Sequence, residues 1–435
     1  MDGDSELVVI DLGLERGEPE SYANRRTTIP VWFPTVLLAA FVLLCTTASS
    51  PPPRAAVNQM FTLRVGPADA YALTDHGQLL AQTFGTLSSF NLDTGLMSWQ
   101  AGQSTPAYRL RLGDGLVLMR PWTVSGRDPG TTAISVATGV PRWERPGTVV
   151  TVAGSSTLLA VNALRSLSGT GRRVQGPAVE AIDPFSGNAR WSVPVKSTAV
   201  MMGLPGPADA GGRLLLVHDN RTLAVHDLET GRRLAATDVP AADYDPGNPA
   251  VTGGKILLRH PGAQSAEITA YDPATLKQLW TVPAGQAYKV KECGVLACLI
   301  GSTGVRAVDP ATGDQVWSQP QWRDIDVRGT MYVAFGGAEG TDPVAVVDPD
   351  TGAARVDIAG WRPVGGAGAG DHLLLTRVVA GAGRTMVAVA RPGESRPRVL
   401  ATLPEGTGDC QSVPGRLVCR SMYGELVVWA YSLKG

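Results

Sequence analysis

Residues 308–317 read VDPATGDQVW, and the same kind of phrase recurs along the whole chain. It consists of a short apolar segment, an Asp, a Thr-Gly turn, and a Trp four residues after the Gly. Residues 90–99 (FNLDTGLMSW) and 182–191 (IDPFSGNARW) are the clearest other copies. Self-similarity with a period of a few tens of residues is the signature of a repeat architecture, so this phrase defines a structural unit.

Degenerate copies extend the repeat through the rest of the sequence. They are Thr138-Gly139 with Trp143, Asp227 with Gly231, Asp272 with Trp280, and Asp348 with Gly352, while Ala235 and Val356 fill the Trp position where Trp is absent. Four short strands with tight turns fit within one such unit. The sequence therefore predicts an all-β protein, a β-propeller. Third strands near residues 90, 134, 180, 225, 270, 306, 346, 387 and 428 are nine candidates; because the last two lack the full phrase, we expect eight blades and allow nine.

The residues of the phrase have architectural roles. An Asp accepts hydrogen bonds from turn amides, a Gly adopts positive φ, and a Trp covers the gap between radially arranged sheets. Cofactor stacking is the alternative role for the Trp rings, but rings that recur once per unit favour packing. The turn and packing positions are Asp93, Gly95, Trp99, Trp143, Asp183, Trp191, Asp227, Asp272, Trp280, Asp309, Gly313, Trp317 and Asp348.

The two ends of the repeat region complement each other. Residues 426–434 resemble a third strand that lacks its outer partner, and Met60 to Val65 resemble an outer strand without a blade. Pairing of these segments closes a ring and removes free sheet edges, so we expect the N-terminal strand to complete the last blade.

The phrase resembles the repeat of pyrroloquinoline quinone (PQQ)-like propellers, and the resemblance covers Gln59 to Gly435. That superfamily holds quinone-dependent dehydrogenases and non-catalytic relatives, among them outer-membrane assembly lipoproteins that bind no quinone. The dehydrogenases carry adjacent cysteines, which this chain lacks, and no C-x-x-C-H haem site is present. Acids such as Asp324, Asp326, Asp348 and Asp350 show no spacing typical of a calcium site. We therefore expect no catalytic residues, cofactor or metal.

Residues 29–47 form the only long apolar run. About 19 apolar residues cross a bilayer as a helix, and Arg25 and Arg26 before the run place the N-terminus in the cytoplasm. We expect a cytoplasmic tail (1–28), a membrane helix (29–48), a linker (49–58) and an extracytoplasmic propeller (59–435). A cleaved signal peptide and lipid attachment at Cys45 are alternatives. The tail's run 9–13 (VIDLG) resembles tails of actinobacterial propeller proteins; an incidental patch in a disordered tail is the other interpretation.

Four cysteines fall in two near pairs, Cys293 with Cys298 and Cys410 with Cys419. Each pair spans a predicted hairpin, so cross-strand disulfides are expected, consistent with export. Metal ligation is the weaker alternative, because the chain has only 5 His residues and none lies beside these pairs.

The composition excludes one class of partner. A formal net charge of −1 gives no basis for nucleic-acid binding. Two insertions stand out: 163–177, with Arg165, Arg172 and Arg173, and 121–132. The first is either an anion-facing loop or a solvated one. We expect a non-catalytic cell-surface scaffold for an envelope protein or a cell-wall ligand; a quinone- or calcium-dependent oxidoreductase and a transmembrane sensor are the alternatives.

Overall fold

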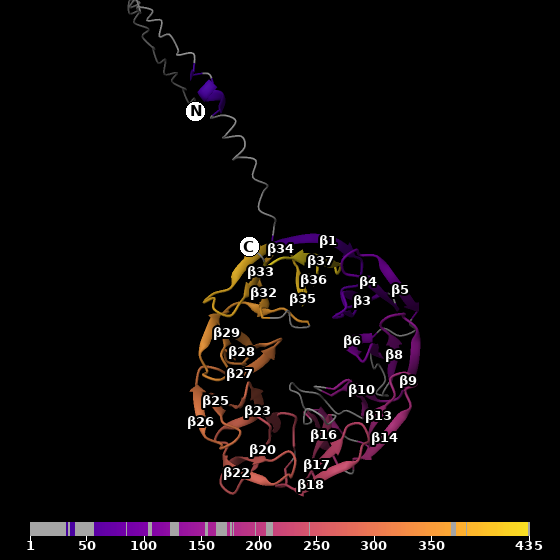
Figure 1. Cartoon of the computed structure of the whole chain (residues 1–435), viewed down its shortest axis with the longest axis vertical. Coiled ribbons are helices and arrows are strands. Elements are labelled where there is room, and N and C mark those ends of the chain that lie inside the picture. Colours follow the sequence, from indigo (N-terminus) through magenta and orange to yellow (C-terminus); the bar gives the residue numbers. More distant parts are fainter. Residues whose placement is uncertain are drawn as a thin grey trace, which may run out of the picture. The chain divides into compact units, whose positions relative to one another are not determined.

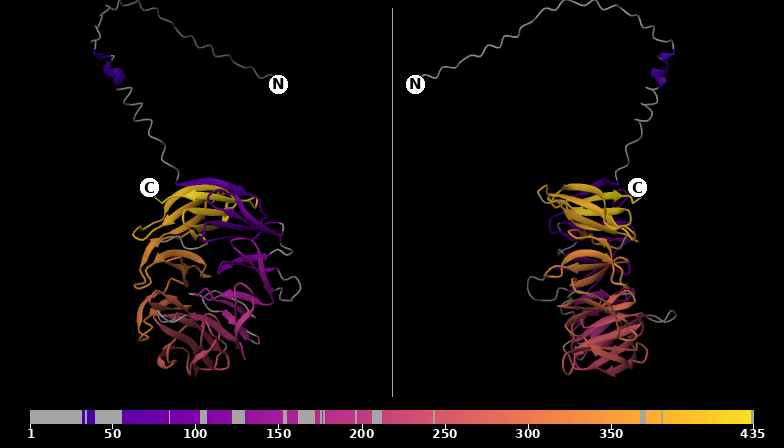
Figure 2. Two further views of the ribbon diagram at one scale, coloured as in Figure 1. Left: turned by 45° about the vertical axis from the view of Figure 1, so that its right-hand side comes forward. Right: turned by 90° about the vertical axis from the view of Figure 1, so that its left-hand side faces the viewer.

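The computed structural model describes residues 32–33, 35–39, 56–83, 85–102, 107–121, 130–152, 155–161, 172–174, 176, 178–195, 197–205, 212–242, 244–366, 371–379 and 381–433. The chain divides into two units, residues 1–54 and 55–435. In the second unit every regular element among the described residues is a β-strand, and the strands form a ring of sheets (Figures 1 and 2).

The ring contains nine blades, the higher of the two numbers that the sequence allows. Blade 1 consists of β2 (Tyr71–Leu73), β3 (Gln78–Thr83), β4 (Thr86–Asn91) and β5 (Met97–Gly102). Blade 2 consists of β6 (Ala107–Gly113), β7 (Leu116–Pro121), β8 (Thr131–Ser135) and β9 (Pro141–Arg145). Blade 3 consists of β10 (Thr148–Thr151), β11 (Leu158–Val161), β13 (Ala178–Ile182) and β14 (Ala189–Pro194). Blade 4 consists of β15 (Ala199–Leu204), β16 (Arg213–His218), β17 (Thr222–Asp227) and β18 (Arg233–Asp238). Blade 5 consists of β19 (Pro249–Thr252), β20 (Lys255–Pro261), β21 (Ala266–Tyr271) and β22 (Gln278–Pro283). Blade 6 consists of β23 (Ala287–Cys293), β24 (Leu296–Gly301), β25 (Gly304–Val308) and β26 (Gln315–Gln319). Blade 7 consists of β27 (Asp324–Arg328), β28 (Met331–Gly336), β29 (Asp342–Val347) and β30 (Ala354–Asp357). Blade 8 consists of β31 (Arg362–Pro363), β32 (Leu373–Val378), β33 (Arg384–Ala390) and β34 (Arg398–Glu405). Blade 9 consists of β35 (Gly408–Val413), β36 (Arg416–Arg420), β37 (Leu426–Tyr431) and β1 (Val57–Leu63).

Each blade is an antiparallel meander that runs from the centre of the ring to its rim, as Figure 1 shows for β23 to β26. The nine third strands lie where the sequence predicts them, including β33 and β37, whose blades lack the full phrase. Blade 4 departs from the four-stranded plan, because β12 (Arg172–Val174) pairs with β15 at its inner edge. This fifth strand comes from the insertion 163–177.

The predicted closure of the ring is confirmed. β1 pairs antiparallel with β37 over Val57↔Tyr431 to Leu63↔Leu426, so the N-terminal strand is the outermost strand of blade 9. Phe61 of this strand takes the Trp position of the phrase: a Cβ on Gly95 of blade 1 would lie 2.9 Å from its ring. The closing strand therefore supplies an aromatic contact of the kind that the other blades make with Trp.

The hydrophobic core lies between neighbouring blades. One cluster joins blades 3 and 4 through Val150, Leu159 and Met201, and another joins blades 4 and 5 through Leu215, Tyr244 and Ile256. Burial between successive sheets is the main stabilising contribution in a ring of this kind.

The first unit is described only at residues 32–33 and 35–39, where Phe33 and residues 35–39 are helical. No helix among the described residues has the length and apolar character needed to span a membrane. Most of the predicted membrane segment 29–48, the tail 1–28, Cys45 and the linker up to residue 55 lie outside the described residues, and the anchor stays a prediction.

Candidate binding surface on the inner wall of the ring

The recurring positions of the repeat phrase lie at the rim and hold adjacent blades together. Each Trp indole Nε1 donates a hydrogen bond to a carbonyl in the turn of the next blade: Trp99 to Val136 (2.8 Å), Trp143 to Pro184 (3.0 Å), Trp191 to Leu228 (3.2 Å), Trp280 to Pro310 (3.0 Å) and Trp317 to Pro349 (2.9 Å). Each ring also covers the Gly of that turn; a Cβ on Gly139 would lie 2.4 Å from Trp99. Glycine is required there both for its positive φ and for the close approach.

The Asp positions cap their own turns. Asp183, Asp227, Asp272 and Asp348 each accept the N–H groups of the second and third residues that follow, and Asp309 accepts the Ala311 N–H at 2.7 Å. In blade 1 this role belongs to Asn91, which accepts from Asp93 and Thr94. Asp93 instead pairs with Arg416 of blade 9 at 2.6 Å, which adds an ion pair to the closure.

Both predicted disulfides are confirmed. Cys293 of β23 bonds Cys298 of β24, and Cys410 of β35 bonds Cys419 of β36. Each links the two innermost strands of its blade. The wall that faces the centre of the ring is thus covalently reinforced in blades 6 and 9.

Charged side chains on the inner strands of blades 6 and 7 form a ladder. Lys291 Nζ lies 2.8 Å from Asp324 Oδ1 and 3.7 Å from Asp326 Oδ1, and Lys289 Nζ lies 3.3 Å from Asp324 Oδ2. Burial and the neighbouring Lys291 lower the pKa of Lys289, and Asp324 opposes that shift. Two of the four acids considered for a calcium site, Asp324 and Asp326, therefore form ion pairs with ammonium groups. Arg328 forms a further ion pair with Asp326 at 3.0 Å.

These residues do not fit a resident cation. Asp348 caps a turn at the rim and pairs with Arg355, away from the ladder in the fold. Among the described residues no three His, Cys, Asp or Glu side chains come together as a metal site would require.

The closure pocket lies where the inner strands of blades 9, 1 and 2 meet. Its cavity has a volume of about 410 Å³, and its lining includes Asp69, Tyr71, Leu110, Asp409 and Arg420. The Tyr71 hydroxyl donates to the Asp409 carbonyl, and burial raises the pKa of Tyr71, so the phenol stays protonated. Arg420 donates to the carbonyls of Gly66 and Asp69, both at 2.6 Å. The pocket's polar groups thus hold the two ends of the propeller together.

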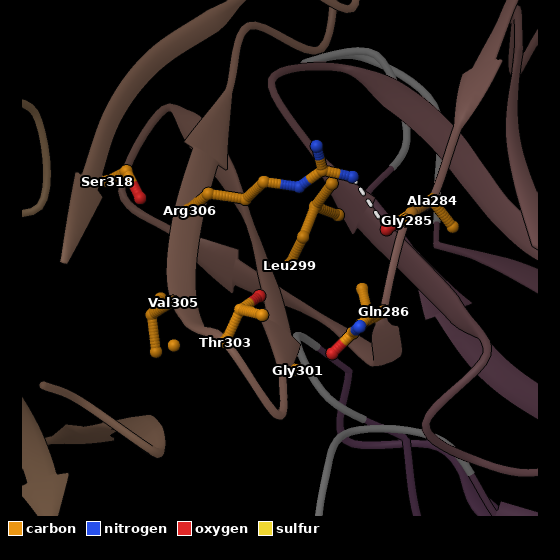
Figure 3. A pocket seen from close by; sticks show the side chains of 11 residues that line it. Ala284, Gly285, Gln286, Leu299, Gly301, Thr303, Val305, Arg306 and Ser318 are labelled. Atoms are coloured by element: carbon orange, nitrogen blue, oxygen red, sulfur yellow. Dashed lines mark hydrogen bonds between the residues drawn. The ribbon is translucent and has the colours of Figure 1, made fainter. Parts of the chain in front are cut away.

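A smaller cavity of about 120 Å³ lies between blades 5 and 6, and Figure 3 shows its side chains. The guanidinium of Arg306 reaches across and donates to the carbonyls of Pro283 (3.0 Å) and Ala284 (2.6 Å). Burial lowers the pKa of Arg306. Because one nitrogen of its guanidinium, Nη2, donates to both backbone carbonyls, this Arg stabilises the blade boundary.

The inner wall of blades 2 to 4 carries arginines on different strands. Arg111 is on β6, Arg120 on β7, and Arg172 and Arg173 on β12. Arg173 pairs with Asp245 at 2.7 Å and with Asp219 at 3.3 Å. Arg172 and Arg173, which the sequence singled out, therefore lie in a strand; Arg165 and most of insertion 121–132 lie outside the described residues.

These observations, repeated blades joined through Trp and closed by an N-terminal strand, agree with the comparison with known families. The family described as outer membrane protein assembly factor BamB matches residues 175–431. The chain belongs to this family. The PQQ-like propeller predicted from the repeat is thereby confirmed, and no protein in the curated set matches the sequence.

Solved structures that resemble this chain do so at low identity. BamB from Moraxella catarrhalis is 14% identical, with a TM-score of 0.41, covering 86% of this chain and 100% of that one. The computationally designed Ika8 protein is 11% identical, with a TM-score of 0.45 and coverages of 86% and 99%. The quinohemoprotein alcohol dehydrogenase of Comamonas testosteroni is 13% identical, with a TM-score of 0.36 and coverages of 81% and 65%. The similar propellers thus include an assembly factor and a dehydrogenase.

Proposed function

We propose that this BamB-family chain is a non-catalytic scaffold of the cell envelope that binds a protein partner through the inner wall and adjoining loops of its ring. The observation that carries the proposal is the ladder of blades 6 and 7. Acids that a metal-dependent oxidoreductase would need are paired there with lysines. A partly buried charge pair of this kind maintains a fixed shape and offers no free general base.

The family supports a protein partner, because it is described as an outer membrane protein assembly factor. We propose that residues 29–48 anchor the chain in the membrane and that the propeller lies outside the cytoplasm. Two disulfides support export, since they persist in oxidising compartments.

Site-specific photo-crosslinking of the full-length chain in its native cells tests the proposal. A photoreactive side chain replaces Leu112 on the inner strand β6, which is 36% exposed, or Leu279 on the rim strand β22, which is 45% exposed. We expect one discrete protein adduct from position 112 and none from position 279. Equal labelling of the two positions would contradict the proposal.

A second measurement addresses the oxidoreductase alternative. Purified full-length chain is titrated with pyrroloquinoline quinone and calcium while thermal stability is followed. We expect no change in melting temperature, because a ligand that binds only the folded state raises it. A saturable increase would overturn the non-catalytic assignment.

A further inference from the structure

Charge is distributed unevenly along this chain. Residues 103–177 contain nine Arg, no Lys and three acids, a net charge of +6, whereas the whole chain has a net charge of −1. The residues of this range that the structure describes form blade 2, the first strands of blade 3 and the fifth strand of blade 4. Positive potential is therefore concentrated on one side of the ring.

Strand alternation directs Arg111 toward blade 3. Leu110 packs with the cluster of blades 1 and 2, so the opposite face of β6 carries residues 111 and 113. A Cβ on Gly113 would lie 2.6 Å from Thr151 of β10, which shows that this face is turned to blade 3. Arg111 shares it.

The same argument directs Arg172 toward blade 3 from the other side. Val174 of β12 is buried in the cluster that joins blades 3 and 4. Arg172, two residues earlier on the same strand, lies on that face, whereas Arg173 lies on the other and pairs with Asp219 and Asp245. On the fifth strand, the guanidinium of Arg173 is therefore neutralised by two aspartates, whereas the guanidinium of Arg172 is directed toward β10.

The convergence of these groups is visible in their interactions. Burial and the neighbouring Arg111 lower the pKa of Arg172. Arg120 of β7 donates to the hydroxyl of Thr148, at the start of β10. Within the described part of the chain, neither Arg111 nor Arg172 forms an ion pair, although every ladder lysine does. Like charges held together without a counter-charge, as those of Arg111 and Arg172 are, are stabilised by an anion.

We propose that Arg111 and Arg172, here called the arginine sector, bind an acidic polypeptide segment of the protein partner. The proposal rests on the scaffold function above and identifies the chemistry of its ligand. Guanidinium groups pair with carboxylates in a fixed, bidentate geometry. The two groups come from different blades and flank a strand of four residues, β10, which at about 3.3 Å per residue matches several successive acidic side chains better than a single small anion.

Fluorescence anisotropy with a labelled octaglutamate peptide tests the sector in the full-length chain. We expect saturable binding that weakens as ionic strength rises from about 0.05 M to about 0.5 M. Arg111→Gln with Arg172→Gln should weaken binding about tenfold or more. The matched control is Arg142→Gln with Arg190→Gln, which removes the same charge from the exposed rim strands β9 and β14 and should leave affinity within about twofold.

The remaining outcomes are decisive. Arg111→Lys with Arg172→Lys keeps the charge and should retain more affinity than the Gln pair; melting curves confirm that each variant is folded. Absence of octaglutamate binding, or equal losses in the sector and rim variants, would overturn the proposal. Inorganic tripolyphosphate that displaces the peptide and binds more tightly through the same arginines would replace the acidic peptide by a phosphate ligand. Photo-crosslinking at Leu112 is read separately, so a failed titration with a preserved adduct rejects the sector and leaves the scaffold function intact.

Discussion

Leu276 occupies in blade 5 the turn position that glycine holds in blades 4, 6 and 7, and it packs in the same core cluster as Ala235 of blade 4. Ala235 stands at the Trp position of the phrase. Ala in place of Trp and Leu in place of Gly belong together, because without an indole ring over the turn there is room for a side chain. Leu276 fills this space: it is buried, and its backbone has a positive φ of 55°. This boundary has exchanged a Trp and Gly pair for an Ala and Leu pair.

A double-mutant cycle tests this exchange. Ala235→Trp alone should destabilise the protein by about 1–3 kcal/mol, because the ring meets Leu276. Leu276→Gly alone leaves a cavity and should cost about 2–5 kcal/mol. We expect the double variant to be more stable than the sum predicts by at least about 1 kcal/mol in urea unfolding. Strict additivity would show that the two positions are independent.

Gly187 is tested against a glycine that faces open space. Its φ is 70°, and an added Cβ would lie 2.6 Å from the Trp143 ring; Gly77 has a φ of 75° with no atom within 4 Å. Gly77→Ala should therefore cost about 1–2 kcal/mol for its backbone conformation alone. Gly187→Ala should cost about 1–3 kcal/mol more, because it also displaces the indole. Equal losses of unfolding free energy would argue against the Trp contact.

The turn aspartates predict a loss of stability in acid. Hydrogen bonds from Ser186, Thr230 and Thr275 lower the pKa of Asp183, Asp227 and Asp272, respectively. A lowered folded-state pKa stabilises the protein above the unfolded-state pKa of about 4, and this stabilisation is lost as pH falls through the folded-state value. The urea midpoint should therefore fall as pH drops from about 5 to about 3.

Asparagine at these positions provides the control for acid sensitivity. Asn91 makes the same two backbone bonds in blade 1 without titrating. The triple variant Asp183→Asn, Asp227→Asn, Asp272→Asn should show a flatter midpoint over the same pH range. An unchanged pH dependence would assign the acid loss to other carboxyls.

Arg420 should contribute to the stability of the ring closure. Its guanidinium donates to the carbonyls of Gly66, Asp69 and Gly424. Arg420→Gln leaves these carbonyls unpaired and should cost about 2–4 kcal/mol of unfolding free energy. The control is Arg355→Gln, whose side chain is 57% exposed and should cost less than about 1 kcal/mol. Similar losses for the two variants would show that the closure does not depend on Arg420.

Reduction of the two disulfides should measurably lower the stability of the protein. Cys293–Cys298 and Cys410–Cys419 close short loops, and the entropy of the unfolded chain gives about 2–3 kcal/mol for each. Paired Ser substitutions should lower the urea midpoint, and the variant lacking both pairs should be insensitive to dithiothreitol. A reductant effect that persists in that variant would have another origin.

The repeat phrase, read alone, determined the propeller, its turns and its closure. Asp183, Gly187 and Trp191 lie within one local unit, and strand, turn and outer strand follow from the chemistry of a few adjacent residues. Local signals of this kind can be recognised in a single sequence because they recur in blades 1 to 7. The final count of nine required the structure, because blades 8 and 9 keep the strands and lose the phrase.

The arginine sector had no such local signal. Arg111 and Arg172 are far apart in the sequence and belong to different blades, and neither lies in the phrase. Only the ring places their strands on either side of blade 3, and only strand alternation turns both side chains toward blade 3. Charge complementarity depends on distances between side chains, which tertiary packing sets, whereas turn formation depends on neighbours in the chain, which the sequence itself supplies.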